Sequence, residues 1–220
     1  MKNIRFIDSV LKMPFMQLPV RTVIVNINGQ EILISPGSKI PSEQYDPKWN
    51  ISDIVAPNSY HHGGVPKAAS IYKNAKLWAV PGLEKKRADI AWTNILDEKS
   101  WPYKDQLEVV PLKGMPKMNE FLFVHKESRS LIVTDMCFNI VGEQGFGQRL
   151  IMSLFGTYNR FAIGRLFTKG IQDKSAFKKS ISKLLSHDFE NIIVSHGSMV
   201  QGNGKAILVK ALAERGLMEP

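Results

Sequence analysis

Cysteine is almost absent from this chain of 220 residues, since Cys137 is the only one. A single cysteine excludes an intrachain disulfide and predicts a reducing, cytoplasmic location. Long apolar runs are missing too: none reaches the roughly 18 residues that a membrane-spanning helix requires. Residues 1–8 lack the long apolar segment and the small-residue cleavage site of a signal peptide, so we expect no secretion.

The motifs of nucleotide binding and serine catalysis are also missing. The glycines of 142–147 do not follow a strong strand in the order that a dinucleotide site requires. The stretch 202–205 lacks the first glycine of a phosphate-binding loop, and Ala206 stands where that loop needs Ser or Thr. No Gly-x-Ser-x-Gly elbow is present. These absences argue against a P-loop nucleotide site and a serine hydrolase.

The composition is that of a globular protein, with 44% hydrophobic and 22% charged residues. The length predicts one domain over residues 1–220. Basic residues outnumber acidic ones by 29 to 20, a net charge of +9, which favours an anionic small-molecule substrate. The basic residues are dispersed and accompany no recognised nucleic-acid motif, so we expect no nucleic-acid partner. The oligomeric state stays open.

Strands dominate the predicted elements of the first half, and helices those of the second. Residues 22–27 and 31–35 flank Asn28-Gly29, a pair that tolerates positive φ and predicts a hairpin. Further strands are predicted at 53–56, 76–80, 107–112, 120–124, 130–134 and 191–194. Helices are predicted at 66–74, 83–89, 148–158, 174–186 and 205–215. This order indicates an α/β domain with helices outside two sheets.

Three distant segments each place a metal-ligand type at the end of an apolar strand. His61 and His62 precede Gly63-Gly64 in a loop, Asp135 follows 131–134, and His196 follows 192–195. Imidazole and carboxylate groups presented at strand ends can converge on one metal ion. The sequence therefore predicts a metal site built from these segments.

This order of motifs resembles the metallo-β-lactamase fold superfamily, and more narrowly a poorly characterised branch of domains of unknown function with degenerate metal motifs. The resemblance spans roughly residues 20–212 and implies a four-layer αββα sandwich. In the superfamily a strand ends in His-x-His-x-Asp-His before glycines. Here Pro57 and Ser59 stand at the first two His positions, His61 at the Asp and His62 at the last His. Asp135 and His196-Gly197 match the later Asp and His-Gly elements.

The resemblance implies that the first of two metal sites is lost, because the loop 112–117 also lacks the expected His. The second site survives as His61, His62, Asp135 and His196. The resemblance also implies one divalent metal, zinc or iron, in a hydrolase-like protein. Esters, lactones, thioesters and phosphoesters are all open as substrates, and no residue is assigned as the acid or base.

Each of these residues also has a structural interpretation. The two adjacent histidines can be exposed in a loop, Asp135 can stabilise a turn, and His196 can be hydrogen-bonded in a turn. If so, the protein is a non-catalytic binding or scaffold protein that keeps the fold and has lost the metal chemistry. His125 and His187 are predicted on the surface because charged residues adjoin them.

Overall fold

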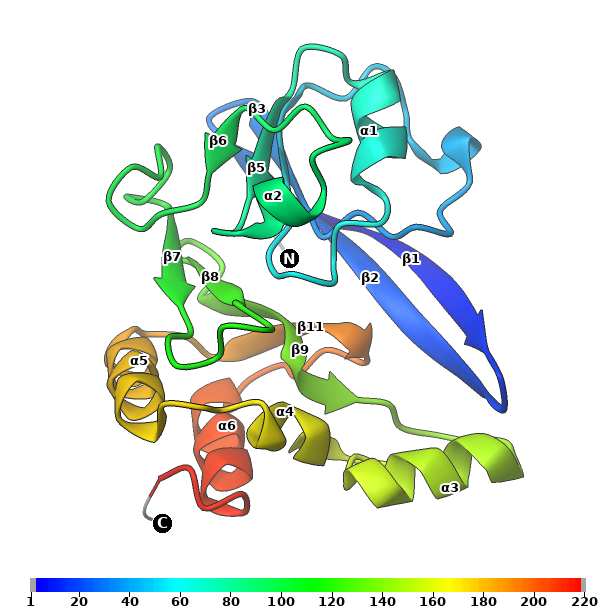
Figure 1. Ribbon diagram of the computed structural model, residues 1–220, viewed down its shortest axis with the longest axis vertical. Coiled ribbons are helices and arrows are strands. Elements are labelled where there is room, and N and C mark those ends of the chain that lie inside the picture. The colour runs from blue at the N-terminus through cyan, green and yellow to red at the C-terminus, as the bar shows by residue number, and fades with distance from the viewer. Residues whose placement is uncertain (1–2, 219–220) are drawn as a thin grey trace.

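Two β-sheets pack face to face in the computed structural model, which describes residues 3–218 (Figure 1). The first sheet has six strands, and each is hydrogen-bonded to the next in chain order. They are β1 (Ile4–Met13), β2 (Met16–Ile27), β3 (Gln30–Ile34), β4 (Ile51–Val55), β5 (Lys76–Ala79) and β6 (Asn94–Ile95).

The second sheet is built around β9 (Ser130–Asn139). On one edge β9 pairs with β8 (Phe121–His125) and then with β10 (Phe161–Ile163), while β7 (Leu107–Pro111) pairs with β8. The parallel partner of β9 is β11 (Asn191–Gly197).

Helices cover the outer faces of both sheets, as Figure 1 shows. The first sheet carries α1 (Val65–Ile71) and α2 (Leu83–Lys86) after the short helix η1 (Ser42–Gln44). The second sheet carries α4 (Arg165–Lys169), α5 (Lys174–Ser186) and α6 (Gly204–Ala213), and α3 (Phe146–Phe155) lies beside the β1–β2 hairpin. The four-layer αββα prediction is confirmed. Within residues 3–218 no helix is long and apolar enough to cross a bilayer.

The core explains the layering. β3 and β4 are buried and apolar along most of their length, the pattern of strands covered on both faces. Residues of both sheets, among them Ile34, Val55 and Phe123, belong to one apolar cluster between the sheets. A second cluster joins the outer face of the second sheet to Phe177 of α5 and Leu208 of α6.

The chain turns are those that the sequence predicts. Asn28 and Gly29 both adopt positive φ, which confirms the hairpin between β2 and β3. Asp173 accepts a hydrogen bond from the Ala176 backbone N–H at 3.0 Å and caps α5. Most boundaries differ by a few residues: the helix predicted at 66–74 ends at Ile71, and Pro66 lies in its first turn.

Some expectations need correction. β1 and the first part of β2 form a long hairpin for which the sequence predicted no bounds. Asp135 does not end β9, because that strand continues to Asn139. His125 is only 2% exposed, since it pairs with Ser130 at the end of β8 and its Nδ1 lies 2.7 Å from Ser128 Oγ. The prediction that His125 is a surface residue was therefore wrong.

Candidate metal centre

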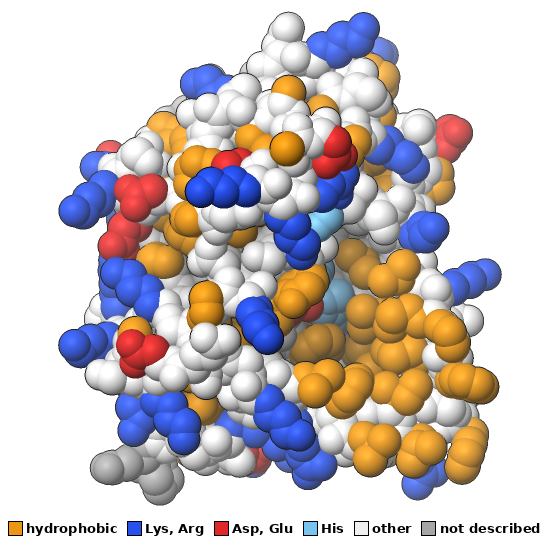
Figure 2. Space-filling view, viewed as in Figure 1, with side chains coloured by type: hydrophobic (Ala, Val, Ile, Leu, Met, Phe, Trp, Pro, Cys, Tyr) orange, Lys and Arg blue, Asp and Glu red, His pale blue; other side chains and the backbone are white. Residues whose placement is uncertain are grey.

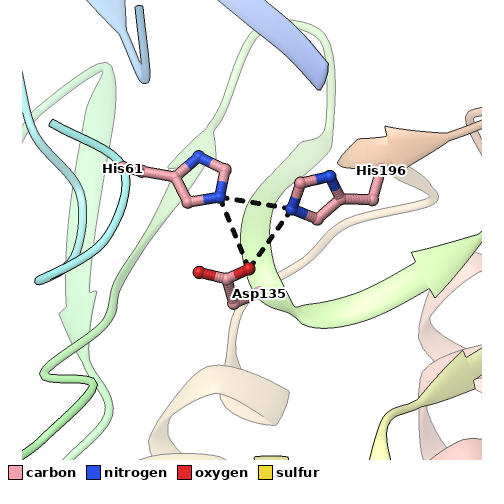
Figure 3. A group of neighbouring side chains, drawn as sticks. All are labelled: His61, Asp135 and His196. Carbon is pink, nitrogen blue, oxygen red and sulfur yellow. Dashed lines mark hydrogen bonds and ion pairs between the residues drawn. The ribbon is translucent and has the colours of Figure 1, made fainter. Parts of the chain in front are cut away.

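Three of the four predicted ligands meet between the two sheets. His61 Nε2 lies 3.2 Å from His196 Nε2 and 3.4 Å from Asp135 Oδ1, and His196 Nε2 lies 3.2 Å from the same oxygen (Figure 3). The three side chains converge from three different segments of the chain. We refer to His61, Asp135 and His196 as the triad.

Local backbone structure places each member. Asn58 Oδ1 accepts hydrogen bonds from the backbone N–H groups of Tyr60 and His61, which holds the loop after β4 in a turn. Asp135 lies in a β-bulge, because β9 advances from Val133 to Phe138 while β11 advances only from Val194 to His196. Bulges redirect side chains next to functional sites, and this one turns Asp135 toward the two imidazoles.

The spacing of the triad atoms fits a bound metal ion. Donors on a tetrahedral zinc, at bonds of about 2.0–2.2 Å, are separated by about 3.3–3.6 Å. The observed separations of 3.2–3.4 Å are close to that range. Two imidazoles and one carboxylate are also ligands that both zinc and ferrous iron accept. The residues present therefore fit a divalent metal.

A second layer of contacts orients the triad. His196 Nδ1 lies 2.8 Å from the carbonyl oxygen of Pro19 and donates to it, which leaves Nε2 to face His61 and Asp135. His61 Nδ1 lies 2.6 Å from Ser35 Oγ. Asn58 Nδ2 donates to Asp135 Oδ2 at 2.7 Å, so Oδ1 alone faces the imidazoles. Such outer contacts fix ring orientation in metal sites.

The triad is strongly coupled electrostatically. Burial alone lowers the pKa of His61, but the charge of Asp135 and its hydrogen bond outweigh burial, and the pKa is raised. Burial raises the pKa of Asp135, and the opposing effects of His61 and His196 leave it well below its usual range. Asp135 is therefore a carboxylate, the form that binds a cation.

A second buried carboxyl group supports Asp135 from behind. Glu120 Oε1 accepts from the backbone N–H groups of Thr134 and Asp135, at 2.8 and 3.1 Å, and from the Thr134 hydroxyl. Burial, followed by the charge of Asp135, raises the pKa of Glu120 to about 7. Glu120 thus occupies the backbone donors that the bulge exposes.

Two cavities meet at the triad. The first has a volume of about 230 Å³ and is bordered by His61, His196, Ser38 and Lys39. The second, of about 410 Å³, is mainly apolar. Asp135, Tyr60 and Leu18 border both cavities.

Solved structures of other proteins share this architecture. No protein-family model matches the chain, and no curated protein matches it in sequence. A metallo-β-lactamase from Pontibacter korlensis is 13% identical, with a TM-score of 0.68 over 98% of this chain and 96% of its own. The mono-zinc form of the metallo-β-lactamase FIM-1 from Pseudomonas aeruginosa is 16% identical, with a TM-score of 0.64 over 99% of this chain and 94% of its own.

This chain has the metallo-β-lactamase fold. The flavodiiron core of Flv1 from Synechocystis is also similar, at 11% identity and a TM-score of 0.65 over 97% of this chain and 59% of that one. At identities this low, the structural similarity establishes the shared fold alone, and the activity has to be argued from the site itself. The narrower branch indicated by the sequence stays a prediction.

His62, the fourth predicted ligand, is not brought to the triad. Its Nδ1 lies 2.7 Å from Nη1 of Arg87, and it does not belong to the group of ligand atoms that the triad forms. Burial, followed by the charges of Arg87 and Lys86, lowers the pKa of His62. Adjacent residues point in different directions, so the loop that presents His61 to the triad carries His62 away from it.

The positions of the superfamily's missing ligands are filled by structural contacts. The Ser59 backbone N–H donates to the carbonyl oxygen of Met118 at 2.9 Å, and the Pro57 carbonyl accepts from the Phe121 backbone N–H at 2.8 Å. The Lys86 ammonium donates to the Ser59 carbonyl at 3.2 Å. A cationic side chain, Lys86, therefore contacts the segment in which Ser59 stands at the position of a first-site histidine.

Residues that sequence reasoning missed include Ser35, Asn58 and Glu120. Asn58 is part of the loop that was singled out, and an Asn three residues before His61 is a signal for an Asx turn. No local pattern marks Ser35 or Glu120, because their partners are 26 and 15 residues away.

Gly197, which follows His196 at the end of β11, tests how closely β11 packs against β9. Its φ is +110°, and a Cβ there would lie 2.2 Å from the Asn139 carbonyl oxygen. We expect Gly197→Ala to lower the free energy of unfolding by about 1–3 kcal/mol or more, since strain and this clash add. Urea denaturation measures it. Gly202→Ala is the control, because Gly202 has positive φ but open space around it; equal losses in both variants would contradict the clash.

Glu120 predicts a pH dependence of stability in the chelator-treated protein. Its folded pKa of about 7 lies above the ordinary 4.5, so the folded state holds this proton more tightly than the unfolded state. The contribution of this proton to the free energy of unfolding is fully present below about pH 4.5 and is lost as the pH rises through 7. The stability of wild type relative to Glu120→Gln, which does not titrate, should therefore fall between pH 5 and 8 in urea titrations.

The control for this titration is Glu143→Gln, which removes one exposed carboxylate outside β9. A difference between wild type and Glu120→Gln that stays constant from pH 5 to 8 would contradict the raised pKa of Glu120.

Proposed function

We propose that this protein is a metal-dependent hydrolase-like protein that holds one divalent metal, zinc or iron, on His61, Asp135 and His196. The observation that carries the proposal is the triad itself: three ligand atoms within 3.2–3.4 Å of one another, each side chain oriented by a further contact. Residues 1–220 form one domain in this proposal, and the substrate is a small molecule with a hydrolysable bond.

A single metal is supported by the charges around the triad. The only group of three or more His, Cys, Asp or Glu side chains with metal-ligand spacing in residues 3–218 is the triad. In the segment where the first-site histidines are missing, the Lys86 ammonium contacts the Ser59 carbonyl, whereas the Arg87 guanidinium that contacts His62 is paired with Asp89, so a second cation there would face the charge of Lys86. The mono-zinc form of FIM-1 is a precedent for one metal on this fold.

The residues of the chain prepare the site in distinct ways. A bound divalent metal supplies a Lewis acid that activates water and polarises an oxygen of the substrate. Pro19 and Ser35 fix the imidazole rings, and Asn58 restrains Asp135 so that one oxygen faces the triad. Three protein ligands leave room for water or substrate, as in catalytic rather than structural zinc sites.

The surroundings support two finer proposals. Lys39 borders the cavity at His61 and His196, which supports an anionic substrate, together with the net charge of +9. Cys137 is the only cysteine, is buried and is free, which suits a reducing, cytoplasmic location. The choice among esters, lactones, thioesters and phosphoesters is not made by the fold.

Metal content is the direct test. We expect about one zinc or iron per chain in the purified, untagged protein, and a loss of at least tenfold in His61→Ala and in His196→Ala, because each removes one of three ligands. Elemental mass spectrometry of protein with matched circular dichroism spectra measures this. Hydrolysis of p-nitrophenyl acetate should fall with the metal content and should be abolished by a chelator.

The matched control is His62→Ala, which removes the neighbouring imidazole that contacts Arg87 and should retain the metal. Loss of metal in His62→Ala alone would show that the ligand set is wrong. Wild-type protein that takes up no zinc or iron would refute the hydrolase proposal and favour a non-catalytic binding protein with this fold.

A further inference from the structure

The larger of the two cavities at the triad is an apolar pocket, which we call the methionine pocket. Its volume is about 410 Å³, and five of its lining residues are methionines. The methionines are Met13, Met16, Met115, Met118 and Met152. Leucine and phenylalanine side chains form much of the remaining wall, namely Leu18, Leu166, Phe138, Phe155 and Phe167. The pocket falls within the size range of small-molecule sites.

The pocket is continuous with the triad. Asp135, Tyr60 and Leu18 border both this pocket and the smaller cavity at His61 and His196. The ring of Phe138 is stacked on the imidazole of His196, with centroids 4.9 Å apart and an interplanar angle of 12°. A molecule whose polar end lies at the triad can therefore extend its other end along Phe138 into the pocket.

The chemistry of the walls selects an aliphatic occupant. The charged residues of the wall are Asp135, at the triad, and Lys117. The Thr157 hydroxyl is already engaged by Met152, so it does not call for a polar ligand. Methionine side chains are flexible and polarisable, and they adapt to chains of varying length and shape. The walls thus suit a flexible hydrocarbon chain.

The loop that lacks the expected histidine contributes to this pocket instead. In the superfamily pattern the segment at 112–117 carries a metal ligand, and here it places Met115 and Lys117 at the pocket wall. Met118 follows in the same turn, and its carbonyl accepts from the Ser59 backbone N–H. This chain therefore places methionine side chains in and next to the segment that carries a ligand of the first metal in the superfamily pattern.

The pocket opens on an apolar face of the molecule. Figure 2 shows hydrophobic side chains gathered beside the hollow in which histidine is visible, over the β1–β2 hairpin and α3. At the pocket itself Met13 is 36% and Leu166 59% exposed, and Leu150 of α3, outside the pocket, is 53% exposed. An elongated apolar group can enter over these exposed apolar side chains.

We propose that the substrate is an ester of a straight-chain aliphatic acid with an anionic alcohol part. Its ester group lies at the triad, its hydrocarbon chain in the methionine pocket, and its alcohol part in the smaller cavity that Lys39 borders. The ester part of this inference rests on the proposed function, whereas the chain-binding part rests on the pocket alone. In the reaction, water oxygen bonds to the acyl carbon, the bond from that carbon to the leaving oxygen breaks, and the leaving alcohol takes up one water proton. The products are the alcohol and the chain-bearing acid.

The first experiment measures chain binding without a metal. Chelator-treated protein is saturated with an apolar fluorescent dye, and straight-chain carboxylates from butanoate to dodecanoate compete for it. We expect affinity to rise about fourfold for each added methylene until the pocket is full. Leu166→Glu and Met13→Glu should each weaken dodecanoate binding at least tenfold, because a carboxylate at the entrance is costly to desolvate.

The matched control is Leu150→Glu, the same change at a similarly exposed leucine that borders neither cavity. It should bind dodecanoate as wild type does. Affinity that is independent of chain length, or an equal loss in Leu150→Glu, would overturn the assignment of the pocket.

The second experiment separates this inference from the proposed function. Metal-loaded protein is assayed with p-nitrophenyl esters from acetate to dodecanoate, and we expect kcat/KM to rise with chain length and Leu166→Glu to flatten that rise. Length-dependent binding without hydrolysis of any ester would refute the ester substrate and the hydrolase while leaving the chain site. Hydrolysis of acetate with no preference for chain length would overturn the pocket assignment and leave the hydrolase.

Discussion

The β-bulge in β9 at Thr134 and Asp135 is the constraint on which the site depends. β8 pairs with β9 at residues 130–132 and β10 pairs with it at 137–139, so the bulge lies between these two ladders. Glu120 Oε1 accepts from the two backbone N–H groups exposed there. A buried donor without an acceptor is costly, and this carboxylate removes that cost in the place of a neighbouring strand. The bulge can therefore persist and carry Asp135 to the imidazoles.

The rest of the triad follows from the packing of two sheets. His196 comes from the second sheet, but its Nδ1 is held by the Pro19 carbonyl of the first, and His61 is held by Ser35 at the end of β3. Each imidazole is thus fixed by a group on the first sheet, while Asp135 belongs to the second. The apolar cluster between the sheets holds them against each other. The triad is therefore assembled only when both sheets are formed.

Local signals predicted the elements well, and tertiary contacts decided the site. Asn28-Gly29 and the cap at Asp173 act over a few residues, so the sequence alone identifies them. The sequence gives no reason to prefer His61 over His62 as a ligand. The folded chain distinguishes them, because it places Asp135 against His61 and Arg87 against His62. Glu120 gave no local signal, since its role depends on a bulge in another strand. The fold and the convergence of three of the four residues predicted as ligands could be anticipated from the sequence, whereas the contacts that support those three residues could not.

The β1–β2 hairpin has a practical consequence for anyone who shortens this protein. Every member of the triad lies after residue 60, so a trimmed version that begins after the hairpin still contains all three. It would nevertheless lack the Pro19 carbonyl that orients His196 and the Leu18 side chain that borders both cavities. The boundary of the smallest useful fragment is set by these contacts, and the hairpin of residues 4–27 belongs to the site as much as the residues that meet there.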